Sequence, residues 1–185
     1  MLQKLNILLG VSGGIAAYKA ASLASILVKQ GAVVRCILTE NAAKLITART
    51  FEAITNNTVI TSMWETGSKY HIGHINLIEK SDIIVVAPAT ANIIAKAANG
   101  IADDMLSTTL CAGWQKPVLL APAMNTGMWQ NPATQRNLEI LKAQKWQIVG
   151  PESGRLACGI ENIGRMSEPE TIADAVKQIA NTQNC

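Results

Sequence analysis

Strand-length apolar runs alternate with helix-compatible stretches along the whole chain. The apolar runs cover residues 5–10, 32–38, 82–87, 117–121 and 146–149, and residues 58–61 fit a further short strand. The helix-compatible stretches cover residues 15–30, 42–54, 93–99, 130–142 and 169–180, and another begins at Asp103. This alternation predicts an α/β fold, a mainly parallel sheet with helices on both faces and right-handed crossovers. The run at 82–87 is almost wholly apolar, so we expect it in the centre of the sheet.

Composition bears on the number of domains and on assembly. The chain has 185 residues, enough for one domain, residues 1–185, that buries roughly 70% of the surface of its unfolded chain. Charged residues make up only 16% of the chain, whereas about 25% is usual. Part of the apolar surface should therefore lie between subunits, which predicts a homo-oligomer.

Charge and hydropathy argue against several kinds of partner. The net charge of +3 is small and no run of Lys or Arg forms a basic stripe, so we expect no nucleic acid. No stretch approaches the roughly 18 apolar residues of a membrane span, and the first residues lack the pattern of a signal peptide. We expect a cytoplasmic protein without a membrane partner.

The spacing of cysteines and histidines argues against a metal site. The cysteines are widely separated and form no Cys-x-x-Cys pair, so reduced thiols are expected. The only histidines, His71 and His74, are three residues apart, but a zinc site needs further ligands and none lies near them in the sequence. We therefore expect no metal.

Polar turns follow several of the predicted strands. Because the carboxyl ends of parallel strands meet at one edge of a sheet, these turns should form a common ligand site. Flavodoxin-like sheets of this doubly wound type bind a mononucleotide flavin at such an edge. The candidate residues are Ser12, Gly13, Gly14, Thr39, Pro88, Thr90, Ala91, Asn92, Ala123, Asn125 and Met128.

Each of these turns also has a purely structural interpretation. The strand, glycine turn and helix around residues 12–14 are arranged as in phosphate-binding sites. The spacing of the glycines matches neither the dinucleotide-binding fingerprint nor a P-loop. The interpretation as a plain strand-to-helix turn therefore remains open. Thr90, Asn92 and Asn125 could simply cap helices. We interpret the acidic residues 103–104 as structural, because the dipole of a helix favours acids in its first turn.

Two segments show no clear periodicity. Residues 63–73 predict an irregular loop, the kind of segment that carries function when a scaffold holds it. Residues 150–166 are rich in glycine and polar side chains, which predicts a mobile segment.

The segment from Pro122 to Trp129 reads Pro-Ala-Met-Asn-Thr-Gly-Met-Trp. It resembles the Pro-x-Met-Asn-x-x-Met-Trp signature of the flavin-dependent cysteine decarboxylases, and among them those of coenzyme A biosynthesis. The resemblance runs over nearly the whole chain and includes the glycine turn, the His74 segment, residues 88–92 and the Cys158 segment.

The resemblance implies FMN as the cofactor and decarboxylation of 4'-phospho-N-pantothenoylcysteine to 4'-phosphopantetheine as the reaction. Oxidation of the C–S unit gives a thioaldehyde, whose C=S group accepts the electrons released with CO2. The resulting enethiol is then reduced and protonated.

The resemblance also implies roles for individual residues. His74 assists deprotonation in the oxidative half, and Asn125 holds the substrate carboxylate beside Met128. Cys158 donates the proton of the reductive half from a flap that closes over the substrate. Ile160 and Asn162 depart from the family pattern, which has Asp and Gly there, so the hydrogen bonding of the flap stays open.

Assembly and partners follow from the same resemblance. It implies a trimer or a dodecamer of trimers, with the flavin site at a subunit boundary, and a phosphopantothenoylcysteine synthetase as a separate or fused partner. Two other functions remain open. One is a peptidyl-cysteine decarboxylase that stops at the enethiol, and the other is a non-catalytic flavin-binding or flavin prenyltransferase-like relative.

Overall fold

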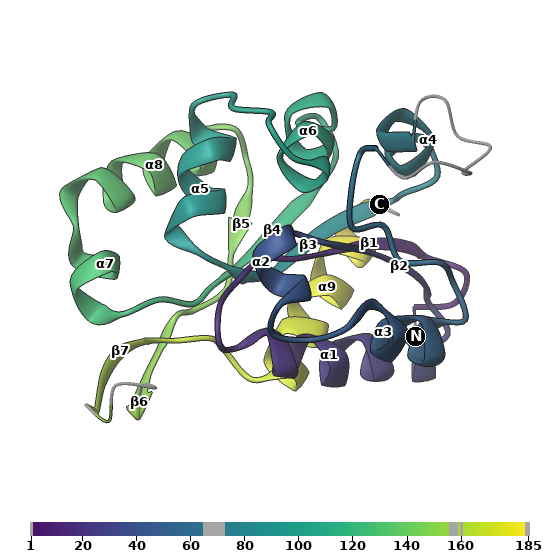
Figure 1. Cartoon of the computed structure of the whole chain (residues 1–185), viewed down its shortest axis with the longest axis horizontal. Coiled ribbons are helices and arrows are strands. Elements are labelled where there is room, and N and C mark those ends of the chain that lie inside the picture. Colours follow the sequence, from purple (N-terminus) through teal and green to yellow (C-terminus); the bar gives the residue numbers. More distant parts are fainter. Residues whose placement is uncertain (1, 65–72, 156–158, 160, 184–185) are drawn as a thin grey trace.

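The structure is a computed structural model that describes residues 2–64, 73–155, 159 and 161–183. It confirms the predicted α/β fold, with a parallel sheet between two layers of helices (Figure 1). The strands are β1 (Asn6–Val11), β2 (Val33–Leu38), β3 (Ile83–Ala89), β4 (Val118–Pro122), β5 (Gln147–Ile148), β6 (Glu152–Arg155) and β7 (Glu161–Arg165). The helices are α1 (Ala17–Lys29), α2 (Glu40–Ala43), α3 (Ala48–Thr55), α4 (Gly73–Glu79), α5 (Ala91–Ala98), α6 (Met105–Ala112), α7 (Thr126–Gln130), α8 (Pro132–Ala143) and α9 (Pro169–Gln183).

The strands of the main sheet lie in the order β2-β1-β3-β4-β5 and pair in parallel. This is the doubly wound order of the flavodoxin-like folds. β3 lies in the middle and all 7 of its residues are buried, as its apolar sequence predicts. The order of connection reverses between β1 and β3, so the binding crevice of such a sheet is expected outside the carboxyl ends of these two strands.

Alternate residues of each strand pack into different cores. Ile7 and Leu9 of β1 point to a core shared with α1, α3 and α9, whereas Leu8 points to a core shared with α5, α6 and α8. This alternation follows from the period of two of an extended strand. Figure 1 shows these two sets of helices on opposite sides of the sheet. The sheet is therefore buried on both faces, and its carboxyl edge is where the polar turns gather.

Side-chain caps begin several helices at that edge. Thr39 Oγ1 accepts a hydrogen bond from the Ala42 N–H at 3.2 Å and so caps α2. Thr90 Oγ1 accepts one from the Ile93 N–H at 3.5 Å and caps α5. Each cap satisfies a donor that the first helical turn leaves without a partner. The capping interpretation of Thr90 is thus correct, and it does not exclude a ligand.

Two of the predicted helices are interrupted. Residues 42–54 form α2 and α3 instead of one helix, because Thr47 is extended, with φ −82° and ψ 150°. Residues 130–142 divide at Asn131, which ends α7 and caps α8 by accepting a hydrogen bond from the Ala133 N–H at 2.8 Å. Pro132 at the first position of α8 has no N–H to give to the preceding helix.

The structure adds to or changes the expectation for three further segments. Residues 58–61 contribute a single bridge, between Ile60 and Ile37, instead of a strand. A helix, α4, begins at Gly73 where the sequence indicated the end of a loop, and residues 65–72 of that loop lie outside the described residues. The glycine-rich segment contains the antiparallel hairpin of β6 and β7. Within the described ranges, no helix combines the length and the apolar character that a membrane crossing requires.

Candidate functional site

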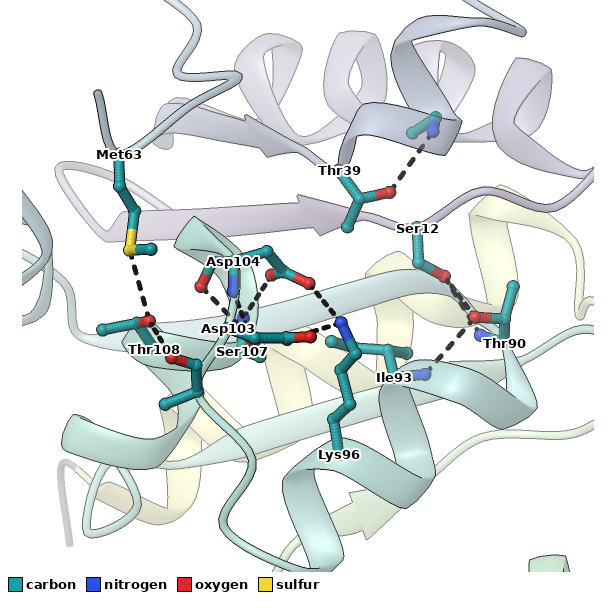
Figure 2. A network of polar contacts seen from close by, with 12 residues as sticks. Ser12, Thr39, Met63, Thr90, Ile93, Lys96, Asp103, Asp104, Ser107 and Thr108 are labelled. Atoms are coloured by element: carbon teal, nitrogen blue, oxygen red, sulfur yellow. Dashed lines mark hydrogen bonds and ion pairs between the residues drawn. The ribbon is translucent and has the colours of Figure 1, made fainter. Parts of the chain in front are cut away.

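Ser12 and Thr90 join the ends of β1 and β3 at the point where the order of strands reverses. The Ser12 hydroxyl donates a hydrogen bond to the Pro88 carbonyl at 2.7 Å, and Ser12 Oγ accepts one from the Thr90 N–H at 3.1 Å. The two hydroxyl oxygens are also 3.1 Å apart. Ser12 is buried, so these bonds fix the relative position of the two turns. Figure 2 shows the pair beside Thr39 at the carboxyl edge of the sheet.

A cavity of about 1080 Å³ opens at this edge. Its wall comes from the turns after β1, β2, β3 and β4 and from the hairpin of β6 and β7. The volume slightly exceeds the range usual for small-molecule sites, roughly 300–1,000 Å³. The cavity can therefore hold a mononucleotide cofactor and a second small molecule beside it.

Most of the predicted site residues share this cavity wall. They are Ser12, Gly13, Gly14, Thr39, Thr90, Asn92, Ala123, Asn125 and Met128. Pro88 and Ala91 flank Thr90 without lining the cavity, and Pro88 contributes through the carbonyl that Ser12 binds. The structure therefore confirms that these loops converge at one edge of the sheet.

The two other predicted catalytic residues are placed differently. His74 is half-buried in α4 and does not line the cavity of its own chain. Helix α4 packs against α6, on the face of the sheet that also carries α5. Cys158 lies outside the described residues.

The described cysteines have no place in the cavity wall. Cys36 is buried in β2, and desolvation raises the pKa of its thiol to about 12. A thiol with so high a pKa stays protonated and is a poor nucleophile at neutral pH. Cys111 is exposed on α6.

Asn125 lies between two hydrogen bonds that tie its loop to β7. The Met124 N–H donates to the Gly164 carbonyl at 3.0 Å, and the Thr126 hydroxyl donates to the Ile163 carbonyl at 2.7 Å. The side-chain oxygen Oδ1 of Asn125 itself accepts a hydrogen bond from the Gly127 N–H at 2.8 Å and caps α7. The loop and the hairpin therefore hold the amide of Asn125 in one orientation at the cavity wall.

A second polar cluster in the wall is built around Lys96 (Figure 2). Its Nζ lies 2.6 Å from a carboxylate oxygen of Asp103 and 2.8 Å from one of Asp104. Desolvation acts to lower the pKa of Lys96, but the hydrogen bonds and charges of both acids outweigh it and raise that pKa. The hydrogen bond from Lys96 likewise lowers the pKa of Asp103. Lys96 and Asp103 are therefore both charged at neutral pH, and the cluster links α5 to the start of α6.

Asp104 also caps α6. Its carboxylate accepts a hydrogen bond from the Ser107 N–H at 2.8 Å, and the Ser107 hydroxyl accepts one from the Asp104 N–H at 3.0 Å. This reciprocal pair is a capping box. The structural interpretation of the acidic pair is thus correct for Asp104, but it missed that both acids line the cavity and hold Lys96.

Two further cations of the wall are held by carboxylates. Lys19 Nζ lies 2.9 Å from Glu168, and its hydrogen bond lowers the pKa of that carboxyl. Arg165 Nη2 lies 3.2 Å from Glu168 and 3.4 Å from Glu152. Sequence reasoning gave none of these residues a role. Lys19 could have been noticed from its place in the helix after the glycine turn, whereas Arg165 depends on a hairpin that was not predicted.

Comparison with known proteins adds to this geometry. A model of the flavoprotein family matches residues 1–181. The coenzyme A biosynthesis bifunctional protein CoaBC of Bacillus subtilis is 48% identical over 172 residues, which are 93% of this chain and 42% of that protein. The chain thus spans about two-fifths of the length of that relative.

Two solved structures are similar over nearly their whole length. One is a mutant of PPC decarboxylase complexed with pantothenoylaminoethenethiol, which is 33% identical with a TM-score of 0.88, over 97% of this chain and 100% of that one. The other is the FMN binding protein AtHal3, which is 34% identical with a TM-score of 0.84, over 97% of this chain and 98% of that one. The chain therefore belongs to the flavoprotein family and, within it, to the flavin-dependent cysteine decarboxylases close to PPC decarboxylase.

Proposed function

We propose that this chain catalyses the FMN-dependent decarboxylation of 4'-phospho-N-pantothenoylcysteine to 4'-phosphopantetheine in coenzyme A biosynthesis. The observation that carries the proposal is a single cavity at the strand switch point whose wall contains both the candidate flavin turns and Asn125 of the signature. Membership of the cysteine decarboxylase family, close to PPC decarboxylase, supports this choice of substrate.

The residues of the cavity fit a mononucleotide flavin. Hydroxyl and amide groups of Ser12, Thr39, Thr90 and Asn92 line it, and such groups together with backbone N–H groups bind phosphate and ribityl oxygens. A Cβ atom at Gly13 would clash with Asn41 Cβ and lie 2.9 Å from the Asn41 carbonyl carbon. Only glycine therefore lets the turn after β1 pass this close to α2. FMN, when bound here, supplies a reversible two-electron oxidation of the substrate.

Asn125 would hold the substrate carboxylate. Its amide lines the cavity and is oriented by the cap bond to Gly127 and by the two bonds from its neighbours to β7. An amide N–H that holds the carboxylate fixes the orientation of the C–C bond to be broken relative to the cofactor. Fixing the orientation of reacting groups contributes strongly to the rate of a reaction.

His74 would assist deprotonation of the substrate. Because it does not line the cavity of its own chain, this role goes together with the proposed homo-oligomer, in which a second copy places His74 at the site. The sequence resemblance that assigns His74 also places the flavin site at a subunit boundary. A trimer, or a dodecamer of trimers, satisfies both.

Two exposed apolar patches support such an assembly. Ile75 adjoins His74 in α4, and Trp64 follows Met63, which contacts Thr108 of α6, the helix that α4 packs against. Trp64 and Ile75 are 83% and 41% exposed. At the cavity, Ile15 and Tyr18 are 67% and 64% exposed. Large apolar side chains this exposed favour burial in an interface. If the first patch of one copy packs on the second patch of the next, the contact is heterologous, and a heterologous contact related by a closed rotation, such as a threefold, gives a ring.

Cys158 would donate the proton of the reductive half. It follows β6 and precedes β7, and β7 is bonded to the loop of Asn125. The strand that follows Cys158 in the sequence is thus hydrogen-bonded to the loop that carries the carboxylate site. The peptidyl-cysteine alternative, which stops at the enethiol, needs no such donor.

Partners and location complete the proposal. CoaBC is named a bifunctional protein, and this chain matches only part of it, which supports a phosphopantothenoylcysteine synthetase as a separate or fused partner. The cytoplasmic location expected from the sequence stays a prediction.

The proposal is tested by measuring cofactor and CO2 together. The purified protein should show the absorbance of an oxidised flavin, and heat denaturation should release FMN. The FMN-loaded protein should then release CO2 from 4'-phospho-N-pantothenoylcysteine. A protein that neither contains nor takes up FMN, or that binds FMN and releases no CO2 from this substrate, would contradict the proposed function. The second result would favour the non-catalytic alternative.

A further inference from the structure

Almost every charged side chain of the cavity wall is neutralised by an ion pair. Lys19, Lys96 and Arg165 are each held by carboxylates. Glu40, an acid of the same wall, pairs with Lys44 at 2.9 Å. Arg155 differs, because its guanidinium makes neither an ion pair nor a side-chain hydrogen bond with any residue in the part of the chain that the structure describes. It is therefore the cation of the wall whose charge is still available to an anion.

Arg155 lies at the rim of the cavity. It is exposed and ends β6, where it stands opposite Glu161 of β7. The hairpin projects beyond the edge of the main sheet beside α7 (Figure 1). Because the Gly164 carbonyl of the same hairpin accepts a hydrogen bond from the Met124 N–H, Arg155 and Asn125 belong to one connected part of the wall. A ligand held at Asn125 can thus extend towards Arg155.

The proposed substrate brings two anionic groups to this cavity, a carboxylate at the cysteine end and a phosphate at the other. Asn125 is assigned to the carboxylate, and the turns around Ser12 and Thr90 suit the phosphate of FMN. The phosphate of the substrate needs a separate site. Arginine suits this task, since its planar guanidinium binds phosphate through two parallel hydrogen bonds.

We infer that Arg155 binds the terminal phosphate of the substrate and thereby selects the phosphorylated substrate over its dephosphorylated form. The inference rests on the proposed function and adds a specificity-determining residue to it. Arg155 takes no part in the chemical step and contributes only to substrate binding. Its loss should therefore change KM and leave kcat unchanged.

The test compares two substrates and four proteins. Steady-state CO2 release is measured with 4'-phospho-N-pantothenoylcysteine and with N-pantothenoylcysteine, which lacks the phosphate. The proteins are the FMN-loaded wild type, Arg155→Gln, Arg155→Lys and the matched control Arg136→Gln. Arg136 is an exposed arginine of α8 that does not line the cavity. FMN content and the unfolding temperature establish that each variant is folded.

Arg155→Gln is expected to raise KM for the phosphorylated substrate by about ten- to a hundredfold, the range for loss of a hydrogen bond to a charged group. KM for the dephosphorylated substrate should stay unchanged. Arg155→Lys should recover part of the loss, because lysine keeps the charge without the planar fork. Arg136→Gln should behave as the wild type with both substrates.

Two results would overturn the assignment of Arg155. One is an Arg155→Gln variant that prefers the phosphorylated substrate as strongly as the wild type does. The other is an active wild type that shows no preference for the phosphorylated substrate. A wild type that loads FMN and decarboxylates neither substrate contradicts the proposed function itself, so the two failures are distinguishable.

Discussion

Asn125 and Asn131 cap two consecutive helices in the same way. The side-chain oxygen of each accepts a hydrogen bond of 2.8 Å from the N–H two residues further along the chain. Asn125 lines the cavity and Asn131 does not. Variants of the two residues therefore test the proposed substrate role of Asn125 separately from its role as a helix cap, a choice that sequence alone left open.

Replacing Asn125 by Asp should abolish CO2 release while the fold persists. Aspartate caps a helix as well as asparagine does, but it removes the N–H donor and sets a negative charge against the substrate carboxylate. We expect CO2 release to fall by about 10²-fold or more, a loss of the size usual for a catalytic group. Stopped assays of CO2 release with FMN-loaded protein measure this.

Asn131→Asp is the matched control. It makes the same chemical change at a cap outside the cavity, so activity and unfolding temperature should stay near those of the wild type. Equal activity of the two variants would remove Asn125 from the substrate site.

The residues of the cavity differ in how far sequence could predict them. Ser12 and Thr90 follow clear apolar strands, and parallel pairing alone brings such residues to one edge. Only the family signature distinguished Asn125, as a candidate substrate-binding residue, from an ordinary helix cap. His74 and Cys158 were assigned by resemblance only. Lys96 meets Asp103 and Asp104 because residues 99–104 fold back so that the start of α6 lies beside α5, and that proximity is not visible in either helix alone.

The hairpin of β6 and β7 is the element that sequence missed and that most affects the site. Its strands are short and polar, so they show none of the apolar alternation that marks a half-buried strand. Its position is set by hydrogen bonds to the loop of Asn125 and by ion pairs of Arg165 with Glu152 and Glu168. Such long-range contacts depend on the finished fold.

Gly164 is where the hairpin and the Asn125 loop come closest. Its φ of +139° is a conformation that suits glycine, and a Cβ there would overlap the carbonyl oxygen of Met124. Gly164→Ala should therefore push β7 away from the loop and disorient Asn125. We expect the free energy of unfolding to fall by about 1–3 kcal/mol. We also expect the fold-decrease in kcat to be larger than any fold-change in the Kd for FMN. Urea denaturation, FMN titration and CO2 release measure these effects.

Gly100→Ala controls for the strain of the backbone alone. Gly100 also has a positive φ, +68°, but a Cβ there meets nothing within 4 Å. This variant should lose stability by a similar mechanism and keep kcat. If Gly164→Ala also kept its kcat, the hairpin would have no part in positioning Asn125.

At the scale of the whole molecule, the parallel sheet was predictable from the sequence, whereas the assembly stays a proposal. Five apolar runs with helices between them restrict the topology to a doubly wound sheet, and the observed order is one of its common forms. The low content of charge indicated an oligomer. Which faces would meet in the proposed oligomer could not be read from the sequence, because Trp64 and Ile75 come to the same helix, α6, only through the contact of Met63 with Thr108 and the packing of α4 on α6.

Replacing Trp64 by Glu should disrupt the proposed oligomer. A charge in place of an exposed tryptophan disfavours burial of the patch around α4 in an interface. We expect a smaller species in light scattering and a matching loss of CO2 release, since His74 would no longer reach a neighbouring cavity. Trp114→Glu is the control, because Trp114 is also exposed but follows α6 in the chain and belongs to neither of the two patches. An unchanged assembly in Trp64→Glu, or a wild type that is an active monomer, would refute the proposed interface.

The most direct measurement of the central claim is the identity of the product. FMN-loaded protein is incubated with 4'-phospho-N-pantothenoylcysteine, and CO2 and the organic product are quantified together by mass spectrometry. Decarboxylation with return of the electrons predicts one equivalent of CO2 and one of 4'-phosphopantetheine, which has lost CO2 and kept the saturated C–C bond. Accumulation of the enethiol, which lacks two further hydrogen atoms, or an absence of CO2 release, would contradict the account.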